Sequence, residues 1–168
     1  MSIEIRGDKE LIEGLNKIQK KLIENPTELL DAGGEIILKT IRQNFMAEGR
    51  PERWVSLAPR TQRERRAEGY GAEHPILRRS GELMKSASEK GAFGNWYEIN
   101  RDTLLIACLL TKGEKLQKGD STKNLPARPF MVLQNNTPKE ILTAMQILII
   151  KKLQEFMPYK ISSVSITK

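Results

Sequence analysis

The segment EGRPERWVSLAPRTQRERRAEGYGAEHPILRRSGELMKS, residues 48 to 86, determines how the rest of this chain is organised. Between residues 50 and 79 it holds eight arginines, four glutamates and no lysine, so about half of the net charge of +7 lies there. Arginine presents a planar set of donors that suits hydrogen-bonded contacts better than the flexible lysine ammonium does. The choice of arginine therefore indicates contacts to phosphate, to carboxylate or to another chain.

Three prolines and one tryptophan, Trp54, punctuate this segment, which has neither helical nor strand periodicity along most of its length. Ordered loops of this length are uncommon in compact domains and are usually functional. We therefore expect residues 49–79 to form a long arginine-rich loop, of which residues 50–71 are mobile in the isolated subunit. Trp54 has two interpretations: it anchors the loop to its own domain, or it is an aromatic hot spot at a subunit contact.

Length and composition indicate one domain over residues 1–168, with a core from about residue 8 to 156 and a C-terminal arm at 157–168. A hydrophobic content of 39% with 5% aromatic residues supports a modest core, which neighbouring subunits often complete. The net charge of +7 favours acidic partners, either nucleic acid or an acidic protein surface, although a solvated basic face is the simpler alternative.

The single cysteine, Cys108, excludes an intramolecular disulfide and fits a reducing compartment. The N-terminus lacks the apolar core of a signal peptide. The longest apolar runs fall far short of the ~20 residues that a membrane-spanning helix needs. We therefore expect a soluble protein made in the cytosol, without membrane contact.

Apolar residues at helical spacing predict a helix over residues 8–22 and a second one over residues 27–46. Gly33 and Gly34 interrupt the second pattern, which indicates close backbone packing or a kink. The sequence Thr137-Pro138-Lys139-Glu140 resembles a capping box and predicts a third long helix, which ends at Met157-Pro158. Residues 80–86 predict one or two further helical turns.

A β-hairpin is predicted from residues 96–100 and 103–110, with a tight turn at Arg101-Asp102. The second strand is apolar on both faces, so we expect it to be central, covered on both sides, with Cys108 buried. Residues 111–125 read as a mobile polar loop, and Met131-Val132-Leu133 as a further strand. The predicted fold class is α+β, with helices packed on a small antiparallel sheet and a long basic loop.

Catalytic and cofactor chemistry finds little support in the sequence. His74 is the only histidine and precedes a proline, so a solvated or packing role is far more common than a catalytic one. Cys108 lies in an apolar strand, where a buried structural thiol is the simpler reading. The spacing of Gly113 and Gly119 does not make a phosphate-binding loop. We expect no enzyme activity, no metal and no cofactor.

The order of several short motifs resembles the phage virion morphogenesis family, the tail-completion proteins of Mu-like and P2-like phages. The matching fragments are Glu48-Gly49-Arg50-Pro51, Trp54, Leu57-Ala58-Pro59-Arg60-Thr61, Arg65, Ile76-Leu77, Ser80-Gly81-Glu82-Leu83, Ser86 and Leu125-Pro126-Ala127-Arg128-Pro129-Phe130-Met131. They fall within about residues 36 to 142. The resemblance implies a structural protein of the virion neck or tail end that acts in tail completion and head–tail joining.

The same resemblance implies a homo-oligomer, commonly a ring of six subunits, that contacts other phage neck or tail proteins and lets DNA pass. Such a protein is found in the virion, and in the host cytoplasm during assembly. The candidate subunit-contact residues are Trp54, Leu57, Arg60, Arg65, Arg128 and Phe130, and the candidate DNA-facing residues are Arg63, Arg66, Arg78 and Arg79. We expect Arg128, held between two prolines, to be exposed and presented to a neighbour.

An alternative from another class is a basic DNA-binding accessory protein, in which residues 50–79 grip phosphates. Four interspersed glutamates and the lack of a recognition-helix signature count against it.

Overall fold

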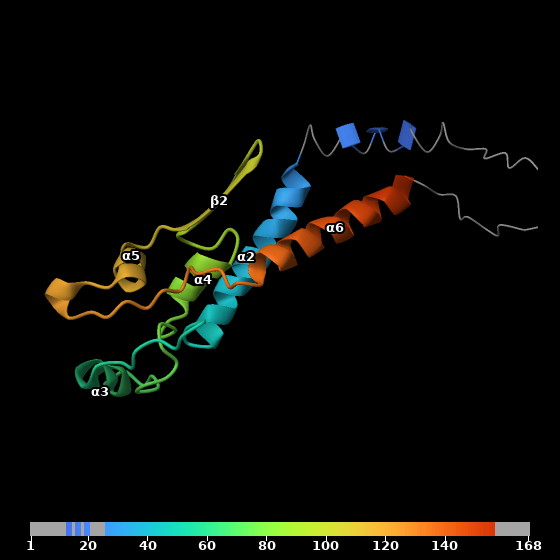
Figure 1. The fold of residues 1–168 in the computed structure, drawn as a ribbon. Coiled ribbons are helices and arrows are strands. Elements are labelled where there is room, and N and C mark those ends of the chain that lie inside the picture. Colours follow the sequence, from blue (N-terminus) through green and yellow to red (C-terminus); the bar gives the residue numbers. More distant parts are fainter. Residues whose placement is uncertain (1–12, 15, 18, 21–25, 157–168) are drawn as a thin grey trace, which may run out of the picture.

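The structure, a computed structural model, describes residues 13–14, 16–17, 19–20 and 26–156, and it has the predicted α+β architecture. In chain order the elements are α2 (Thr27–Met46), α3 (Pro59–Ala67), α4 (Glu82–Ser88), β1 (Asn95–Asn100), β2 (Thr103–Cys108), α5 (Thr111–Lys118), the 3₁₀ turn η1 (Ser121–Lys123) and α6 (Thr137–Phe156). Helices α2 and α6 form one end of the molecule, whereas α3 and α5 lie on two arms at the other end (Figure 1).

The two long helices pack antiparallel. Lys152 near the end of α6 forms an ion pair with Glu28 at the start of α2, with 2.5 Å between Nζ and Oε2. Both helices begin and end close to the residues that the sequence predicts for them. Of the first predicted helix, the described residues 13, 14, 16, 17, 19 and 20 are helical. The rest of that helix and the C-terminal arm at 157–168 lie outside the described residues.

Gly33 and Gly34 do not break α2, which runs through them without interruption. A Cβ at Gly33 would lie 3.0 Å from Met145 Cε of α6. A Cβ at Gly34 would lie 2.1 Å from Tyr97 Oη and 2.9 Å from Leu104 Cδ2 of the hairpin. The prediction of close packing is therefore confirmed. The lack of a side chain at Gly33 lets α6 pack closely on α2. The lack of one at Gly34 lets the hairpin pack closely on another side of the same helix.

Strands β1 and β2 pair as the predicted antiparallel hairpin, with Trp96 opposite Ala107 and Glu98 opposite Leu105. Arg101 adopts a positive φ of 54° at the turn. The expectation that the second strand is central is wrong, because the described sheet has only these two strands. Helix α2 covers one face of the hairpin, and among the described residues the side chains of the other face, such as Trp96 and Leu105, are exposed.

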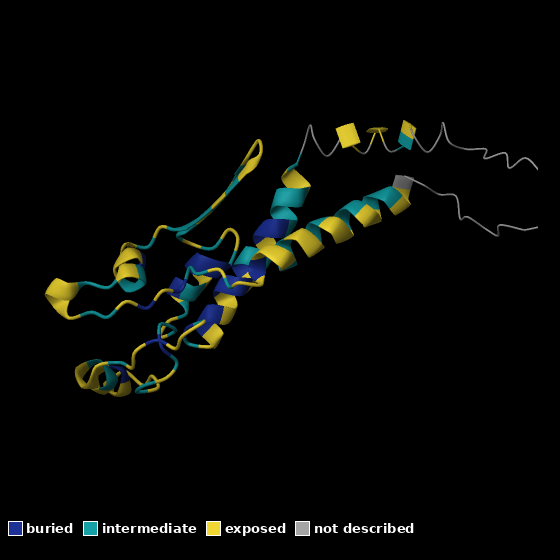
Figure 2. Cartoon of the chain, viewed as in Figure 1, coloured by how far each residue is buried: buried dark blue, intermediate teal, exposed yellow. Residues whose placement is uncertain are grey.

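The core lies where α2, α4 and the loops from both arms meet, and Figure 2 shows the buried residues gathered at this junction. The buried hydrophobic residues are Leu38, Ile41, Phe45, Trp54, Ile76, Leu83, Ala87 and Phe130. Cys108 is only half-buried, beside Ser86, with 3.2 Å between Sγ and Oγ. Five of the buried hydrophobic residues come from α2 and α4, and Trp54, Ile76 and Phe130 come from segments without regular secondary structure.

Two segments that the sequence predicts as loops contain helices. Helix α3 begins at Pro59, whose fixed φ suits the first helical position, and continues through good helix formers. Helix α5 packs closely on β2, since a Cβ at its buried Gly113 would lie 3.2 Å from Cys108 Sγ. The strand predicted at residues 131–133 does not form.

The start of α6 differs from the predicted capping box. The Thr137 hydroxyl accepts a hydrogen bond from the Gln134 amide, with an N–O distance of 3.0 Å, instead of receiving one from Glu140. The Glu140 carboxylate accepts from the Asn136 side chain. The side chains of Thr137 and Glu140 therefore bind residues of the turn before the helix instead of forming the capping box.

Candidate functional site

Glu48, at the start of the arginine-rich segment, forms hydrogen bonds both to the beginning of the segment and to its end. Glu48 has a φ of 56°, and its backbone carbonyl accepts the Trp54 amide at 2.7 Å. Its side chain accepts the amide of Ile76 at 3.0 Å and contacts His74 Nδ1 at 2.6 Å. Gly49 has a φ of 112°, where a Cβ would lie 2.7 Å from Trp54 N. Glu48 thus joins the beginning of the segment to its end, and the turn between them requires glycine.

Asn44, a fully buried residue of α2, connects three segments of the chain. Its amide nitrogen donates to the carbonyls of Phe130 and Val132 at 2.9 and 2.8 Å. Its amide oxygen accepts from Arg50 Nε at 3.0 Å and from Gln134 Nε2 at 3.3 Å. Arg50 also donates to a carbonyl of α2, that of Thr40, at 3.1 Å. Every polar atom of this buried amide has a partner, as a buried polar group requires.

Trp54 anchors its loop to its own domain, as the first interpretation proposed. It is 7% exposed, and its indole N–H donates to the Pro129 carbonyl at 3.0 Å. Its ring meets Phe45 edge to face at 5.6 Å between centroids, and Phe45 lies 5.2 Å from Phe130. This aromatic group joins the two halves of the family-like signature inside one subunit.

Arg128 and Arg65 are each only 3% exposed. Arg128 donates from Nε and Nη2 to the carbonyls of Val55 and Ser56, both at 3.0 Å, and burial lowers the pKa of its guanidinium. Arg65 donates from Nη2 to the Pro75 carbonyl at 3.0 Å. The prediction that Arg128 is exposed and presented is wrong. The side chain of Arg128 lies inside the protein, where it holds the loop that follows Trp54.

The six candidate subunit-contact residues therefore fall into two groups. Trp54, Arg65, Arg128 and Phe130 are buried within one chain. Leu57 is half-buried, and Arg60 is exposed and forms an ion pair with Glu64, one turn along α3, at 2.8 Å. Only Leu57 and Arg60 keep enough surface to contact a neighbour, and for them a subunit contact stays a prediction.

The four candidate DNA-facing residues differ in exposure and in their partners. Arg63 and Arg66 are exposed on α3, without an ion pair to any described residue. Arg78 is partly buried, with Nη1 3.2 Å from Met46 Sδ and Nη2 4.0 Å from Glu48 Oε1. Arg79 forms an ion pair with Glu68 and lies over the ring of Tyr70. DNA contact stays a prediction for all four residues, of which Arg63, Arg66 and Arg79 are exposed.

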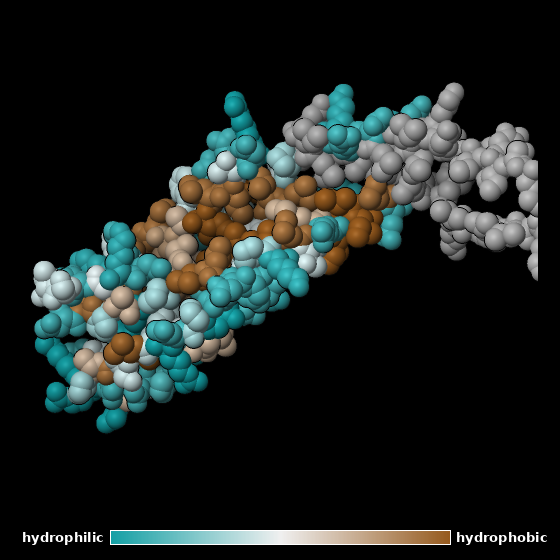
Figure 3. Space-filling view, in the orientation of Figure 1, coloured by the Kyte–Doolittle hydropathy of each residue, from teal (hydrophilic) through white to brown (hydrophobic). Residues whose placement is uncertain are grey.

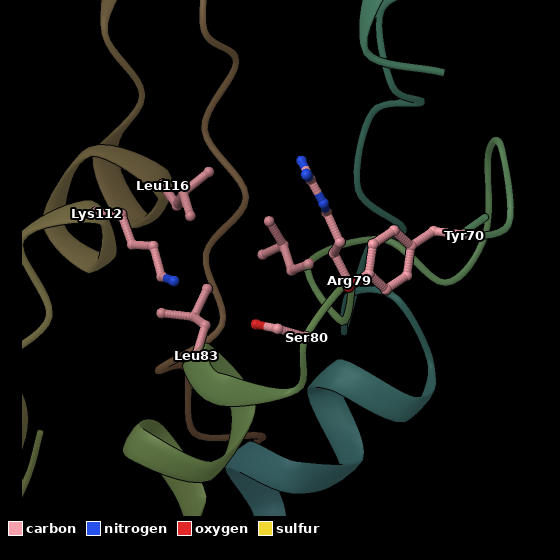
Figure 4. Close-up of a pocket in the computed structure, with 7 residues that line it drawn as sticks. Tyr70, Arg79, Ser80, Leu83, Lys112 and Leu116 are labelled. Carbon is pink, nitrogen blue, oxygen red and sulfur yellow. The ribbon is translucent and has the colours of Figure 1, made fainter. Parts of the chain in front are cut away.

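Two adjoining cavities, of about 530 and 460 Å³, lie between the arm that carries α3 and the arm that carries α5. Leu77, Arg79 and Leu116 line both. Figure 4 shows the smaller one, in which Arg79, Ser80 and Leu83 lie between Tyr70 of one arm and Lys112 and Leu116 of the other. We call the two together the inter-arm groove. Its lining is apolar with cationic side chains among the leucines.

A second feature is the open face of the hairpin, which we call the hairpin outer face: Trp96, Glu98, Leu105, Ala107 and the adjoining Leu109. Trp96, Leu105 and Leu109 are 45%, 53% and 58% exposed. Figure 3 shows apolar side chains gathered over the region of the hairpin and the long helices. Helix α6 adds Leu142, Ile147 and Ile150, which are also exposed.

On its covered face the hairpin is held to α2 by Tyr97, whose hydroxyl donates to the Asp31 carboxylate at 2.7 Å. Lys90 lies 2.5 Å from the same carboxylate. Hydrogen bonds from Lys90 and then Tyr97 lower the pKa of Asp31. Burial, followed by the hydrogen bond to Asp31, raises the pKa of Tyr97.

Reactive groups are sparse in the described part of the chain. No group of three histidine, cysteine or acidic residues there could hold a metal ion. His74 has Glu48 as its one hydrogen-bond partner among the described side chains. No described helix is long and apolar enough to span a bilayer.

Sequence reasoning missed Asn44 and Gln117, the two amides that hold the Pro-Ala-Arg-Pro-Phe segment. Gln117 accepts the amides of Phe130 and Met131 at 2.9 and 3.0 Å. A signal for Asn44 was present, because it falls on the apolar stripe of α2 beside Ile41 and Phe45, where a polar residue needs a partner. Gln117 has no such signal.

No family model, no curated protein and no solved structure matches this chain.

Proposed function

We propose that this chain is a structural subunit of a phage neck or tail end, which assembles with copies of itself into a closed ring. The observation that carries the proposal is the hairpin outer face, where three large apolar side chains of one small sheet are about half exposed. Exposed apolar surface of this kind, with polar residues around it, marks interaction sites in proteins.

The physics of the hairpin supports an oligomer. A two-stranded hairpin is only marginally stable in water unless its apolar surface is packed. Within the described residues each strand also has one edge that pairs with no further strand, which is a template for pairing with another chain. Within the described residues α2 covers the face with Tyr97 and Leu104, so a neighbouring copy is the natural cover for the other. Repetition of one such contact around an axis closes a ring.

The place of this ring in a virion is taken from the resemblance to the phage virion morphogenesis family. On that basis we propose a ring of about six subunits that completes the tail, joins it to the filled head and contacts other neck or tail proteins. DNA passes through it without specific recognition. The ring belongs to the virion and is assembled in the host cytoplasm.

The test is size-exclusion chromatography with light scattering on the native protein and on Leu105→Lys. Leu105 is exposed in the single chain, so the substitution should leave folding unchanged to within about 0.5 kcal/mol. At an interface it buries a charge against apolar side chains, and the ring should dissociate. Leu133→Lys is the matched control, because Leu133 is also about half exposed but lies in the loop before α6.

We expect a closed oligomer for the native protein and the control, and a folded monomer for Leu105→Lys. A native monomer at high concentration, or a Leu105→Lys variant that still forms rings, would remove the hairpin outer face from the proposal.

A second candidate, a basic DNA-binding accessory protein, is favoured by the unpaired exposed arginines of α3, Arg63 and Arg66. Retention of duplex DNA over a salt series distinguishes the two. Affinity that falls steeply with salt and is lost in an Arg63→Glu, Arg66→Glu double variant supports DNA binding. A ring without measurable duplex affinity supports the assembly protein.

A further inference from the structure

The larger cavity of the inter-arm groove contains two buried cations that lack a counter-ion. Arg65 and Arg128 both line it, each 3% exposed. Neither forms an ion pair with any described residue, and both are held only by backbone carbonyls. Arg65 Nε, moreover, is buried and has no hydrogen-bond partner. Burying a charge without a compensating charge is costly, so such an arrangement is unusual unless something completes it.

The other charged side chains that line the cavity are also cationic. Arg79 and the exposed Lys123 complete a set of four cationic side chains around the cavity, and its lining contains no acidic residue. Arg79 already has Glu68, which lies outside the lining. The rest of the lining is mostly apolar, with four leucines from both arms, and includes the uncharged polar residues Ser56, Thr61 and Asn124. The cavity thus offers fixed guanidinium donors inside an apolar wall.

We propose that this cavity of about 530 Å³ is a docking site for an acidic peptide segment of another protein, which places one carboxylate between Arg65 and Arg128 and apolar side chains on the leucines. Guanidinium groups bind carboxylates through paired, charge-assisted hydrogen bonds, and the buried Arg65 Nε has no partner among the described residues. The volume falls in the range of sites that enclose a few residues or a small ligand.

The geometry favours a peptide over duplex DNA. Phosphates on a rigid duplex are reached by exposed, extended side chains, whereas the two guanidinium groups here are recessed and nearly covered. The leucine side chains of the lining have neither a charge nor a hydrogen-bond donor for the phosphates of a nucleic acid. A flexible extended segment can enter a narrow groove between two arms. The site shares no residue with the hairpin outer face, so the proposal stands or falls independently of the ring.

Thr61 provides a direct test. It lines the same cavity and precedes Arg65 by four residues on α3, so the two side chains share one face of the helix. A Thr61→Glu variant supplies an internal carboxylate to Arg65, which should raise the thermal midpoint and block the site. Thr61→Gln is the neutral control of the same shape. Lys123→Glu at the exposed rim is a second blocking variant, and Lys139→Glu, on α6, is its control.

The probes are the capped tripeptide acetyl-Leu-Glu-Leu-amide, its glutamine analogue, inorganic phosphate and a short DNA duplex. Binding is followed by NMR titration of the full-length protein, with the Arg65 Nε–H signal as the reporter. We expect the glutamate peptide to shift that signal and to bind at least tenfold more tightly than the glutamine peptide. Thr61→Glu and Lys123→Glu should each weaken it at least tenfold, and both controls should bind as the native protein does.

Three results would overturn the proposal. Equal binding of the glutamate and glutamine peptides would leave no role for the arginines. Binding unchanged by both blocking variants would place the peptide elsewhere. Selective binding of the duplex or of free phosphate, lost in the blocking variants, would assign the cavity to phosphate instead of to an acidic peptide. Because Lys123 is exposed, its substitution stays informative even if Thr61→Glu does not fold.

Discussion

The arginine-rich segment and the β-hairpin place their side chains in opposite ways. In the segment from residue 50 to 79, Trp54 and Arg65 are buried, and Arg128 donates hydrogen bonds to the backbone carbonyls that follow Trp54. In the hairpin, Leu105 and Trp96 lie open to solvent on the outer face. The polar arginine-rich segment therefore buries some of its side chains in the core, whereas apolar side chains of the hairpin form part of the surface.

The two regions differ in how their backbone hydrogen-bonding groups find partners. Outside α3, the segment from residue 50 to 79 has many backbone carbonyls that need donors, and a buried guanidinium supplies several at once. A hairpin satisfies its own backbone, so its side chains are free to face a partner. Charge alone does not indicate an interface, and an apolar run alone does not indicate a core.

The largest effect should come from Arg128→Glu. It places a carboxylate beside the carbonyls of Val55 and Ser56 in a buried site and removes both of their donors. We expect a loss of about 4 kcal/mol or more in the free energy of unfolding, measured by urea denaturation with circular dichroism. Arg63→Glu makes the same charge change on an exposed arginine of α3 and should cost less than about 0.5 kcal/mol. Equal midpoints for the two variants would contradict the comparison.

A smaller effect should come from the covered face of the hairpin. Gly34→Ala directs a methyl group at Tyr97 Oη, 2.1 Å away, and the rigid ring cannot yield without losing its bond to Asp31. We expect a net loss of about 1 to 3 kcal/mol from overpacking. Gly33→Ala meets the flexible end of Met145 at 3.0 Å and Ile141 Cγ2 at 3.2 Å, milder contacts that the gain of about 1 kcal/mol in helix propensity offsets. That variant should be neutral or slightly stabilised. If thermal unfolding shows both alanines equally harmful, the hairpin is not docked at Gly34.

The smallest effect concerns the Asp31 carboxylate. Its pKa is lowered from 3.8, so its contribution to stability is present above that pH and is lost as the pH falls through the lower, folded-state pKa. Asp31→Asn should cost roughly 0.5 to 1 kcal/mol at pH 7, because the pair with Lys90 is half exposed and screened. The difference between the variant and the native protein should vanish well below pH 3.8. A difference that persists at pH 2 would mean that shape, and not charge, is what Asp31 contributes.

The parts of the fold that were predictable are those set by local sequence. Apolar periodicity and a proline at its start located α2, and a two-residue turn between apolar runs located the hairpin. The candidate site was less predictable. For Trp54 the sequence left two interpretations open, and the structure supports the anchor within its own domain, whereas the expectation that Arg128 is exposed is wrong. Helix α5 was missed because its eight residues have few apolar side chains, and it is held by packing on β2 and through Gln117.

By itself, the sequence determined the fold class, the two long helices and the pairing of the hairpin, because these depend on neighbours a few residues apart. The tertiary structure alone decided which arginines are buried. Arg63 and Arg65 are two residues apart on α3, yet only Arg65 donates a hydrogen bond to a backbone carbonyl outside the helix, that of Pro75. The tertiary structure also decided that α2 covers one face of the hairpin only. Burial depends on what distant segments place opposite a side chain, and that information is not local.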